Sequence, residues 1–279
     1  MNENNRKIIN SFLSNKLGVS GAIIVIIIII IALLAPLISP YTPVEMDLRN
    51  RRKGPILKHP FGTDKFGRDI LSRIIYGTRV SLSVGLISVG IGVLGGIILG
   101  LYAGYYGKII DNFIMRFMDM LISFPSILLA MVVITVLGSS MTNTMIAIGI
   151  TYIPIFTRIV RASVLKIKNQ EFVIASLALG STDTKILFKH ILPNILAPII
   201  VQSSLALSGA ILTEAALSFL GLGVQPPMPS WGSMLSDSRR YMELAPWTVI
   251  FPAVAIMFSV LGFNLFGDGL RDVLDPKLK

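Results

Sequence analysis

The stretch "VSGAIIVIIIIIIALLAPLI", residues 19–38, contains no charged residue and is long enough to cross a lipid bilayer as a single helix. Such a helix needs about 20 mainly apolar residues, because its backbone polar groups must hydrogen-bond within the segment. The stretch follows a basic start with Arg6, Lys7 and Lys16, exceeds the apolar core of a signal peptide, and is not followed by a small-residue cleavage site. We therefore interpret it as a retained transmembrane helix.

The composition extends this interpretation to the whole chain. Of the 279 residues, 53% are apolar and only 14% are charged, and the mean hydropathy is +0.75, values typical of a membrane protein rather than a soluble domain. The net charge is +10, but the Lys and Arg residues lie between apolar runs, which indicates membrane topology and lipid contact rather than nucleic-acid binding. Since there is no Cys, structural disulfides and Cys-ligated metals are excluded.

Six apolar segments predict an all-α, polytopic membrane protein with both termini on one side. The predicted spans cover residues 19–38, 80–101, 117–137, 145–160, 195–217 and 249–266. Lys and Arg outside the spans favour cytoplasmic termini, although the basic loop at 39–79 weakens this bias. Pro125, Pro154, Pro198 and Pro252 lie within or near the ends of the later spans, where a proline bends a helix.

The second span carries glycines at a strict four-residue spacing: Gly92, Gly96, Gly100 and Gly104. This spacing leaves a bare stripe on which another helix can pack closely. The alternative is that glycine is simply frequent in membrane helices, and Gly90 and Gly95 do fall off the stripe.

Groups for catalysis or for energy conversion are missing from the sequence. The only Gly-Lys pair is followed by Ile109, so no phosphate-binding loop is present. His59 and His190 are far apart and lie beside basic residues, which disfavours a metal site or a catalytic triad. Glu214 is the best candidate for a functional charge within the membrane, or else it reaches headgroups or pairs with a neighbouring helix. We conclude that the chain is not an enzyme and that any energy comes from another protein.

The stretch "EFVIASLALGSTDTKILFKHILPNI", residues 171–195, separates the fourth and fifth spans. Phe172, Ala175 and Leu179 form one apolar patch at helical spacing, and a second patch follows at 186–192. Gly180 suits the end of the first helix, and residues 181–183 suit the cap of the next. The pattern predicts helix, sharp turn, helix, and it fits either a lipid-surface anchor or a docking element.

Residues 175–194, "ASLALGSTDTKILFKHILPN", resemble the cytoplasmic EAA loop of permeases from ABC importers. Three further stretches narrow the resemblance: "HPFGTDKFGRDILSRIIYGTRVSLSVG" (59–85), "FLGLGVQPPMPSWGSMLSDSR" (219–239) and "FNLFGDGLRDVLDPKLK" (263–279). Together they are similar to the C-type permease subunit of dipeptide, oligopeptide and nickel importers, over nearly the whole chain.

The resemblance implies a type I ABC-importer permease fold in the plasma membrane of a prokaryote. It also implies a heterodimer with a homologous permease, two cytoplasmic ATPases that bind ATP, an extracytoplasmic solute-binding protein, and no cofactor in this chain. The implied division is a tail, first helix and outer loop at 1–78, a permease domain at 79–268 with its EAA loop near 163–194, and a cytoplasmic tail at 269–279.

In this family the EAA segment docks into an ATPase subunit. Carried onto this chain, the coupling residues would be Glu171, Ala175, Ser176, Leu179, Gly180 and Pro193, with Pro193 marking the return to the membrane. Ile174 occupies the position of the family's leading Glu, which puts a charged contact there in doubt, and Glu171 is the possible replacement.

The outer segments carry two more motifs. In 62–73, "GTDKFGRDILSR", the candidate residues are Gly62, Asp64, Gly67, Arg68 and Asp69. The alternating charges of Asp64, Arg68, Asp69 and Arg73 would fold the loop by ion pairs, or else the loop contacts the solute-binding protein or forms a lid. In 225–232, "QPPMPSWG", Trp231 is a candidate interfacial anchor. The alternative is again that this segment contacts the solute-binding protein or covers the pathway.

The expected function is therefore one half of a membrane pathway for di- or oligopeptides. Nickel or another small solute remains an alternative cargo. A self-sufficient secondary transporter and a membrane anchor without a pathway are the alternatives from other classes.

Overall fold

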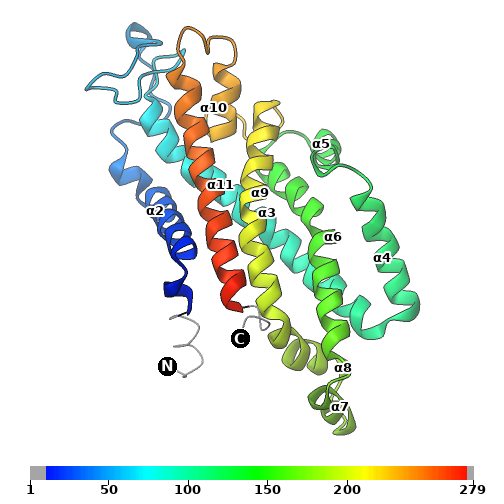
Figure 1. The fold of residues 1–279 in the computed structure, drawn as a ribbon. Coiled ribbons are helices and arrows are strands. Elements are labelled where there is room, and N and C mark those ends of the chain that lie inside the picture. The colour runs from blue at the N-terminus through cyan, green and yellow to red at the C-terminus, as the bar shows by residue number, and fades with distance from the viewer. Residues whose placement is uncertain (1–10, 275–279) are drawn as a thin grey trace.

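The computed structural model describes residues 11–274, whose regular structure is helical, with no strand among these residues (Figure 1). The predicted tail residues at 1–10 and 275–279, including Arg6, Lys7, Lys277 and Lys279, lie outside the described residues. In chain order the elements are α2 (Lys16–Ile38), η1 (Leu48–Asn50), α3 (Ile70–Tyr106), α4 (Lys108–Ile122), α5 (Ser126–Leu137), α6 (Met141–Ile167), α7 (Glu171–Ala178), α8 (Asp183–Lys185), η2 (Ile186–Ile191), η3 (Leu192–Ile195), α9 (Leu196–Phe219), α10 (Trp231–Ser238) and α11 (Trp247–Leu274).

Five helical segments in the described part of the chain are long and apolar enough to span a membrane: α2, α3, α6, the run from α8 through α9, and α11. The predicted third span, 117–137, consists of two helices, because α4 and α5 meet at an angle of 92° near the proline at which a bend was predicted. Pro125 lies at the break, where its ring disfavours a helical conformation for Phe124. With the bent pair counted as one span, the described residues hold six.

Helices α3, α6 and α11 extend well beyond their predicted spans. Helix α3 begins at Ile70 rather than near residue 80, and Asp69 caps it by accepting a hydrogen bond of 2.7 Å from the Ser72 amide. Helix α11 continues to Leu274. The expected domain boundaries at 78–79 and 268–269 therefore fall inside helices, since hydropathy marks the lipid-immersed part of a helix rather than its ends.

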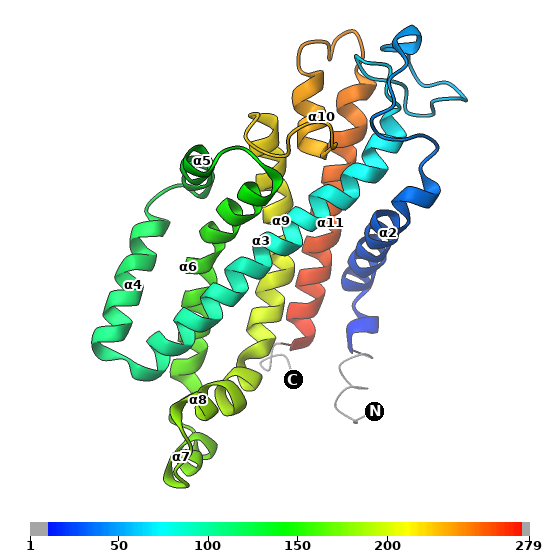
Figure 2. The ribbon, with the colours of Figure 1, turned by 180° about the vertical axis from the view of Figure 1, so that it is seen from behind.

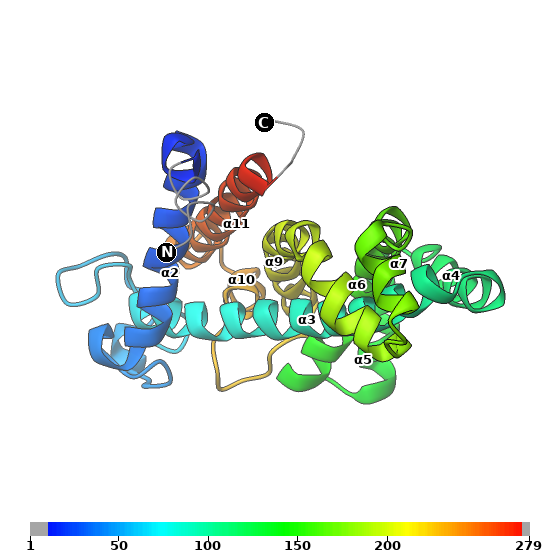
Figure 3. The same cartoon turned by 90° about the horizontal axis from the view of Figure 1, so that it is seen from below.

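The long helices form two adjoining hydrophobic cores. One lies among α3, α5, α6, α9 and η2, and the other among α2, α3, α9, α10 and α11. Helix α3 crosses the molecule and contributes to both (Figures 2 and 3). Helix α2 packs on α11 at one side, whereas α4 lies at the opposite edge beside α6.

The two ends of the molecule differ. We call the end that holds the loop at 39–69 and α10 the loop end, and the opposite end the α7 end (Figure 1). The first described turns of α2 and the last turn of α11 both lie at the α7 end, where Asn15 Nδ2 donates a hydrogen bond of 2.8 Å to Asp272 Oδ2. Both described termini are thus on the side that carries α7.

Candidate functional site

Helix α7 ends in a Schellman turn at the α7 end of the molecule. Gly180 has a φ of +76°, and its amide donates to the Leu177 carbonyl at 2.9 Å. The Ser181 amide donates to the Ser176 carbonyl at 3.1 Å. This pair of hydrogen bonds satisfies the last carbonyls of the helix and needs a residue that tolerates positive φ, which is why glycine is favoured there. The chain then reverses into α8.

The outer surface of α7 is apolar and has no partner among the described residues. Ile174, Leu177 and Leu179 are 55%, 57% and 86% exposed. Glu171, Ala175 and Gly180 are exposed beside them. A cluster of large exposed apolar side chains at one tip of a protein is typical of an interaction site.

Ser176 does not belong to this surface. It is only 7% exposed and lies with buried Val173 on the inner face of α7, which packs on η2. The expectation that Ser176 makes an outward docking contact is therefore wrong in this conformation. Its carbonyl instead accepts the hydrogen bond from Ser181 that fixes the turn.

Two tyrosines that the sequence analysis overlooked tie the turn to α3. Tyr105 Oη and Tyr106 Oη donate to the two carboxylate oxygens of Asp183 at 2.9 and 3.1 Å. Lys168 Nζ adds a hydrogen bond of 2.9 Å to the Gly104 carbonyl. A cluster of tyrosines at the end of an apolar run was the available signal. The segment after α7 is thus fixed to the last turn of α3.

The second apolar patch differs from its predicted form. Ile186, Leu187 and Ile191 are buried in the first core, whereas Phe188, which belongs to the predicted patch at 186–192, is 42% exposed. Residues Ile186–Ile191 form a π-helix, whose wider turn shifts the buried positions. Exposed Pro193 lies in η3 and does not interrupt the helical run from Asp183 to Phe219.

The four regularly spaced glycines of α3 all face α6. A methyl group added at Gly100 or Gly104 would lie 2.6 Å from Val160 Cβ or 2.7 Å from Val164 Cβ. Gly92 and Gly96 make equivalent approaches to Tyr152 and Phe156. Partners at the same four-residue spacing mean that the two helices run parallel and in register. By contrast, a methyl group at Gly90 would meet no atom within 4 Å.

Helix α4 is held to α6 by two arginine–aspartate pairs. Arg161 binds both carboxylate oxygens of Asp111, at 2.5 Å from Nε and 2.6 Å from Nη2. Arg158 Nη2 lies 2.5 Å from Asp119 Oδ1. These contacts position the first half of the bent pair.

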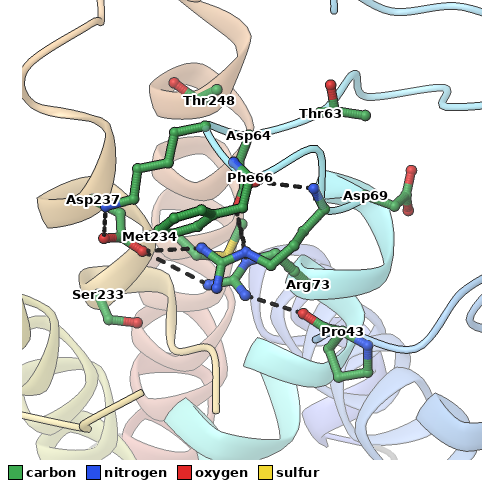
Figure 4. A network of polar contacts seen from close by, with 12 residues as sticks. Pro43, Thr63, Asp64, Phe66, Asp69, Arg73, Ser233, Met234, Asp237 and Thr248 are labelled. Atoms are coloured by element: carbon green, nitrogen blue, oxygen red, sulfur yellow. Dashed lines mark hydrogen bonds and ion pairs between the residues drawn. The ribbon is translucent and has the colours of Figure 1, made fainter. Parts of the chain in front are cut away.

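At the loop end, ion pairs fold the loop onto α10 (Figure 4). Arg68 donates from Nε to Asp64 Oδ2 at 2.6 Å and from Nη2 to Asp237 Oδ2 at 3.3 Å. Lys65 Nζ donates to Asp237 Oδ1 at 2.7 Å. Arg73 Nη1 donates to the Pro43 carbonyl at 3.0 Å. The cluster therefore joins the loop, the start of α3 and α10.

The remaining loop residues have structural roles as well. His59 Nδ1 lies 2.9 Å from Asp69 Oδ1, and Gly62 and Gly67 have φ values of +77° and +76°. Asp64, Arg68 and Asp69 are buried and present little surface to a partner. Burial, together with the charges of Asp237 and Asp64, raises the pKa of the nearby Tyr241 hydroxyl to about 12.

Trp231 is not an interfacial anchor. It is 2% exposed, begins α10, and donates from Nε1 to the Ile74 carbonyl at 3.2 Å. Helix α10 folds back between α3, α9 and α11, so the ring becomes part of the second core. The same burial leaves this side chain little surface for the contact with a solute-binding protein that the sequence suggested.

Glu214 is fully buried between α9 and α3, so it does not reach lipid headgroups. Its carboxylate accepts hydrogen bonds from Ser81 Oγ at 3.0 Å and from Ser218 Oγ at 2.7 Å. The sequence suggested that Glu214 pairs with a neighbouring helix, and its partner there is Ser81 of α3. Among the described residues, no group of three His, Asp or Glu side chains is arranged to hold a metal.

Comparison with known families adds the decisive observation. The sequence model described as "Binding-protein-dependent transport system inner membrane component" matches residues 96–279. The chain belongs to this family of transport permeases. A second model, "N-terminal TM domain of oligopeptide transport permease C", matches residues 6–55 of the same permease. The family consists of ABC-importer permease subunits rather than enzymes.

Curated relatives align along almost all of the permease. It is 52% identical over 274 residues to the dipeptide transport system permease protein DppC of Alkalihalophilus pseudofirmus, covering 98% of this chain and 90% of the relative. It is 46% identical to the glutathione transport system permease protein GsiD of Pectobacterium atrosepticum, covering 98% and 91%. The identity is also 46% to the di/tripeptide transport system permease protein DppC of Pseudomonas aeruginosa, covering 96% and 91%.

Among solved structures, the permease resembles a chain of the MetNI methionine ABC transporter in an inward-facing conformation. The TM-score is 0.59 at 20% identity, covering 73% of this chain and 97% of the other. The permease therefore has the type I ABC-importer fold.

Proposed function

We propose that this permease forms half of the membrane pathway of an importer for di- or oligopeptides. Its partners in this proposal are a homologous second permease, two cytoplasmic ATPases that bind ATP, and an extracytoplasmic solute-binding protein, in the plasma membrane of a prokaryote. The observation that carries the proposal is the exposed apolar surface of α7, which a helix at the tip of a permease offers to another subunit. The peptide cargo rests on the names of relatives at 46–52% identity.

In this proposal α7 is the element that an ATPase subunit grips. Ala175 and Leu179 supply its contact surface, Gly180 fixes the turn, and Glu171 offers a carboxylate at the first turn in place of the acid that Ile174 replaces. Ser176 shapes the turn from within. Pro193 belongs to the continuous helical run that carries any displacement of α7 into α9.

This role places the α7 end in the cytoplasm. Because the described ends of α2 and α11 lie at the same end, both termini are cytoplasmic in the proposal. The loop at 39–69 and α10 then face the solute-binding protein. In this proposal the first helix with its outer loop, the permease domain and the cytoplasmic tail differ in function, although their boundaries fall inside helices α3 and α11.

Transport follows from a shift in conformational populations. ATP binding closes the ATPase pair, and α7 is displaced because it is held in a cleft of one ATPase. The hydrogen bonds of Asp183 to Tyr105 and Tyr106 carry the displacement to α3, and buried Ile186 and Leu187 carry it to the core. The outward-open pathway is then favoured, and hydrolysis reverses the shift.

The proposal is tested by Leu179→Asp in the assembled transporter, reconstituted in liposomes and assayed for ATP-driven uptake of a labelled dipeptide. We expect loss of uptake and weaker co-purification of the ATPases, because a carboxylate would enter an apolar contact. The matched control is Leu57→Asp, for which co-purification of the ATPases should be unchanged, since Leu57 is fully exposed at the loop end, away from α7.

Other outcomes would redirect the assignment. Unchanged uptake by Leu179→Asp would remove α7 from the coupling role. Uptake driven by a proton gradient without ATPases would indicate a self-sufficient secondary transporter. Uptake of nickel but not of dipeptides would show that the cargo is nickel. If no substrate could be crosslinked to the permease, the chain would be a membrane anchor without a pathway.

A further inference from the structure

A cleft of about 740 Å³ opens at the α7 end between α6, the start of α9 and the end of α11. It is separate from the exposed surface of α7 and from the glycines that face α6. The coupling role uses none of its walls directly. Its size and its lining residues are those of a separate binding site.

The charged residues that line the cleft are both basic. Lys166 comes from the last turn of α6 and Arg271 from the last turn of α11. Asn194 of η3 adds an amide beside them, and none of the lining residues within 11–274 is acidic. Two cations from separate helices therefore create a positive rim at the inner ends of the spans, which favours an anionic group.

The polarity of the cleft changes with depth. Helix α6 runs toward the α7 end and α9 runs away from it, so Ile159, Val201 and Leu205 lie deeper than Lys166 and Asn194. Ser163 Oγ donates to the Ile159 carbonyl of its own helix, which leaves Gln202 as the polar group available in the deeper part. The cleft therefore has basic residues at its mouth and apolar walls deeper inside, where Gln202 supplies an amide.

This gradient distinguishes between two anionic occupants. A peptide carries an ammonium group as well as a carboxylate, and its backbone needs polar partners along its length. The described residues that line the cleft supply no acidic group, and its deep walls are apolar. An anionic phospholipid carries its negative phosphate at the membrane surface, its ester carbonyls below and its acyl chains deepest. The order of charge, amide and apolar wall matches the lipid.

We propose that the cleft binds one anionic phospholipid from the leaflet at the α7 end. Lys166 and Arg271 bind the phosphate, Gln202 donates to an ester carbonyl, and an acyl chain lies against Ile159, Val201 and Leu205. The lipid joins α6, α9 and α11 at their inner ends. The site requires neither the peptide cargo nor the ATPases.

Native mass spectrometry of the purified full chain tests this site, with phosphatidylglycerol or phosphatidylcholine titrated into the detergent solution. We expect one phosphatidylglycerol to bind in preference to phosphatidylcholine. Lys166→Gln with Arg271→Gln should weaken this binding on the order of 25-fold, since each basic residue near an anionic lipid surface contributes a factor of about five. The matched control is Lys185→Gln with Lys189→Gln, which removes equal charge at the same end of the molecule.

A second variant tests the apolar part without changing any charge. Val201→Trp fills the deeper cleft, and we expect it to reduce retention of phosphatidylglycerol while the unfolding temperature of the protein is maintained. Equal binding of the two lipids, or unchanged phosphatidylglycerol affinity in the Lys166 and Arg271 double variant, would overturn the proposal. Displacement of the lipid by a dipeptide at the same site would assign the cleft to cargo instead.

Discussion

At the loop end, individual side chains make contacts within the loop and with distant segments of the chain, and the sequence identified some of them and missed others. The alternating charges at 62–73 suggested ion pairs within the loop, and Arg68 does bind Asp64. Asp237, from a segment 169 residues away, completes the cluster, and no local pattern could identify it. Trp231 was predicted to lie at the membrane interface because tryptophan is enriched there in membrane proteins. Burial of such a ring depends on how α10 folds back, which is a tertiary property.

The Arg68 cluster leads to a prediction about stability. Arg68→Ala removes the closest ion-pair partner of the buried Asp64 carboxylate and leaves only the longer contact to Arg73 Nε at 3.8 Å. Loss of one member of a buried pair costs up to about 3–5 kcal/mol of unfolding free energy. We expect a large fall in the midpoint of unfolding, followed in detergent by heat or by a denaturing detergent. Arg51→Ala removes an exposed arginine of the same loop and should leave the midpoint nearly unchanged. Equal midpoints for the two variants would contradict the structural role of the cluster.

At the scale of helices, hydropathy located the spans but not their ends or their shape. The run at 80–101 predicted one helix, and α3 exceeds it because Asp69 caps a helix that starts outside the apolar window. The bend between α4 and α5 follows from Pro125, yet its angle of 92° depends on how α5 packs on α6. The π-helix at Ile186–Ile191 shifted the buried face of the second patch, because regular helical spacing does not anticipate an inserted residue.

The packing of α3 on α6 gives a prediction with a built-in control. Gly96→Ala places a methyl group 2.9 Å from the carbonyl carbon of Phe156 and the amide nitrogen of Thr157, where the backbone cannot move aside freely. We expect a loss of about 1–3 kcal/mol in unfolding free energy, as for other overpacked interiors. Gly90→Ala lies on the same helix with open space around it and should be neutral or slightly stabilising, because alanine favours a helix over glycine.

Thermal unfolding of the two purified variants measures this difference. If Gly96→Ala were as stable as Gly90→Ala, the four-residue spacing would reflect the general frequency of glycine in membrane helices rather than close packing. The sequence raised both interpretations. The partner residues on α6, which share the same spacing, are what the sequence alone did not supply.

At the scale of the whole molecule, the structure separates a loop end from an α7 end. The even number of spans predicted termini on one side, and the described ends of α2 and α11 agree with it. The orientation in the membrane followed from a weak charge bias, because the basic residues at 39–79 oppose it. A large part of this loop is held by internal contacts, so its charges reflect folding as well as topology.

The natural absence of Cys permits a direct test of orientation. Leu57→Cys and Leu179→Cys each place one thiol on an exposed position, at opposite ends of the molecule. In cells that produce the permease without the ATPases, which would cover Leu179, we expect a membrane-impermeant maleimide to label Leu57→Cys when the cells are intact. The same reagent should label Leu179→Cys only after the membrane is permeabilised. The reverse pattern would invert the proposed topology and place α7 beyond the reach of cytoplasmic ATPases.

Helix α3 has a mechanical consequence. Its 37 residues span about 55 Å at 1.5 Å per residue, with the Arg73 contact to Pro43 near one end and the Tyr105 and Tyr106 contacts to Asp183 at the other. An unbroken rod of this length acts as a lever: a tilt of about 10° around its midpoint displaces each tip by about 5 Å. A modest tilt of α3 imposed at the α7 end would thus move its other tip, at the loop end, by more than the width of a water molecule, without any local unfolding.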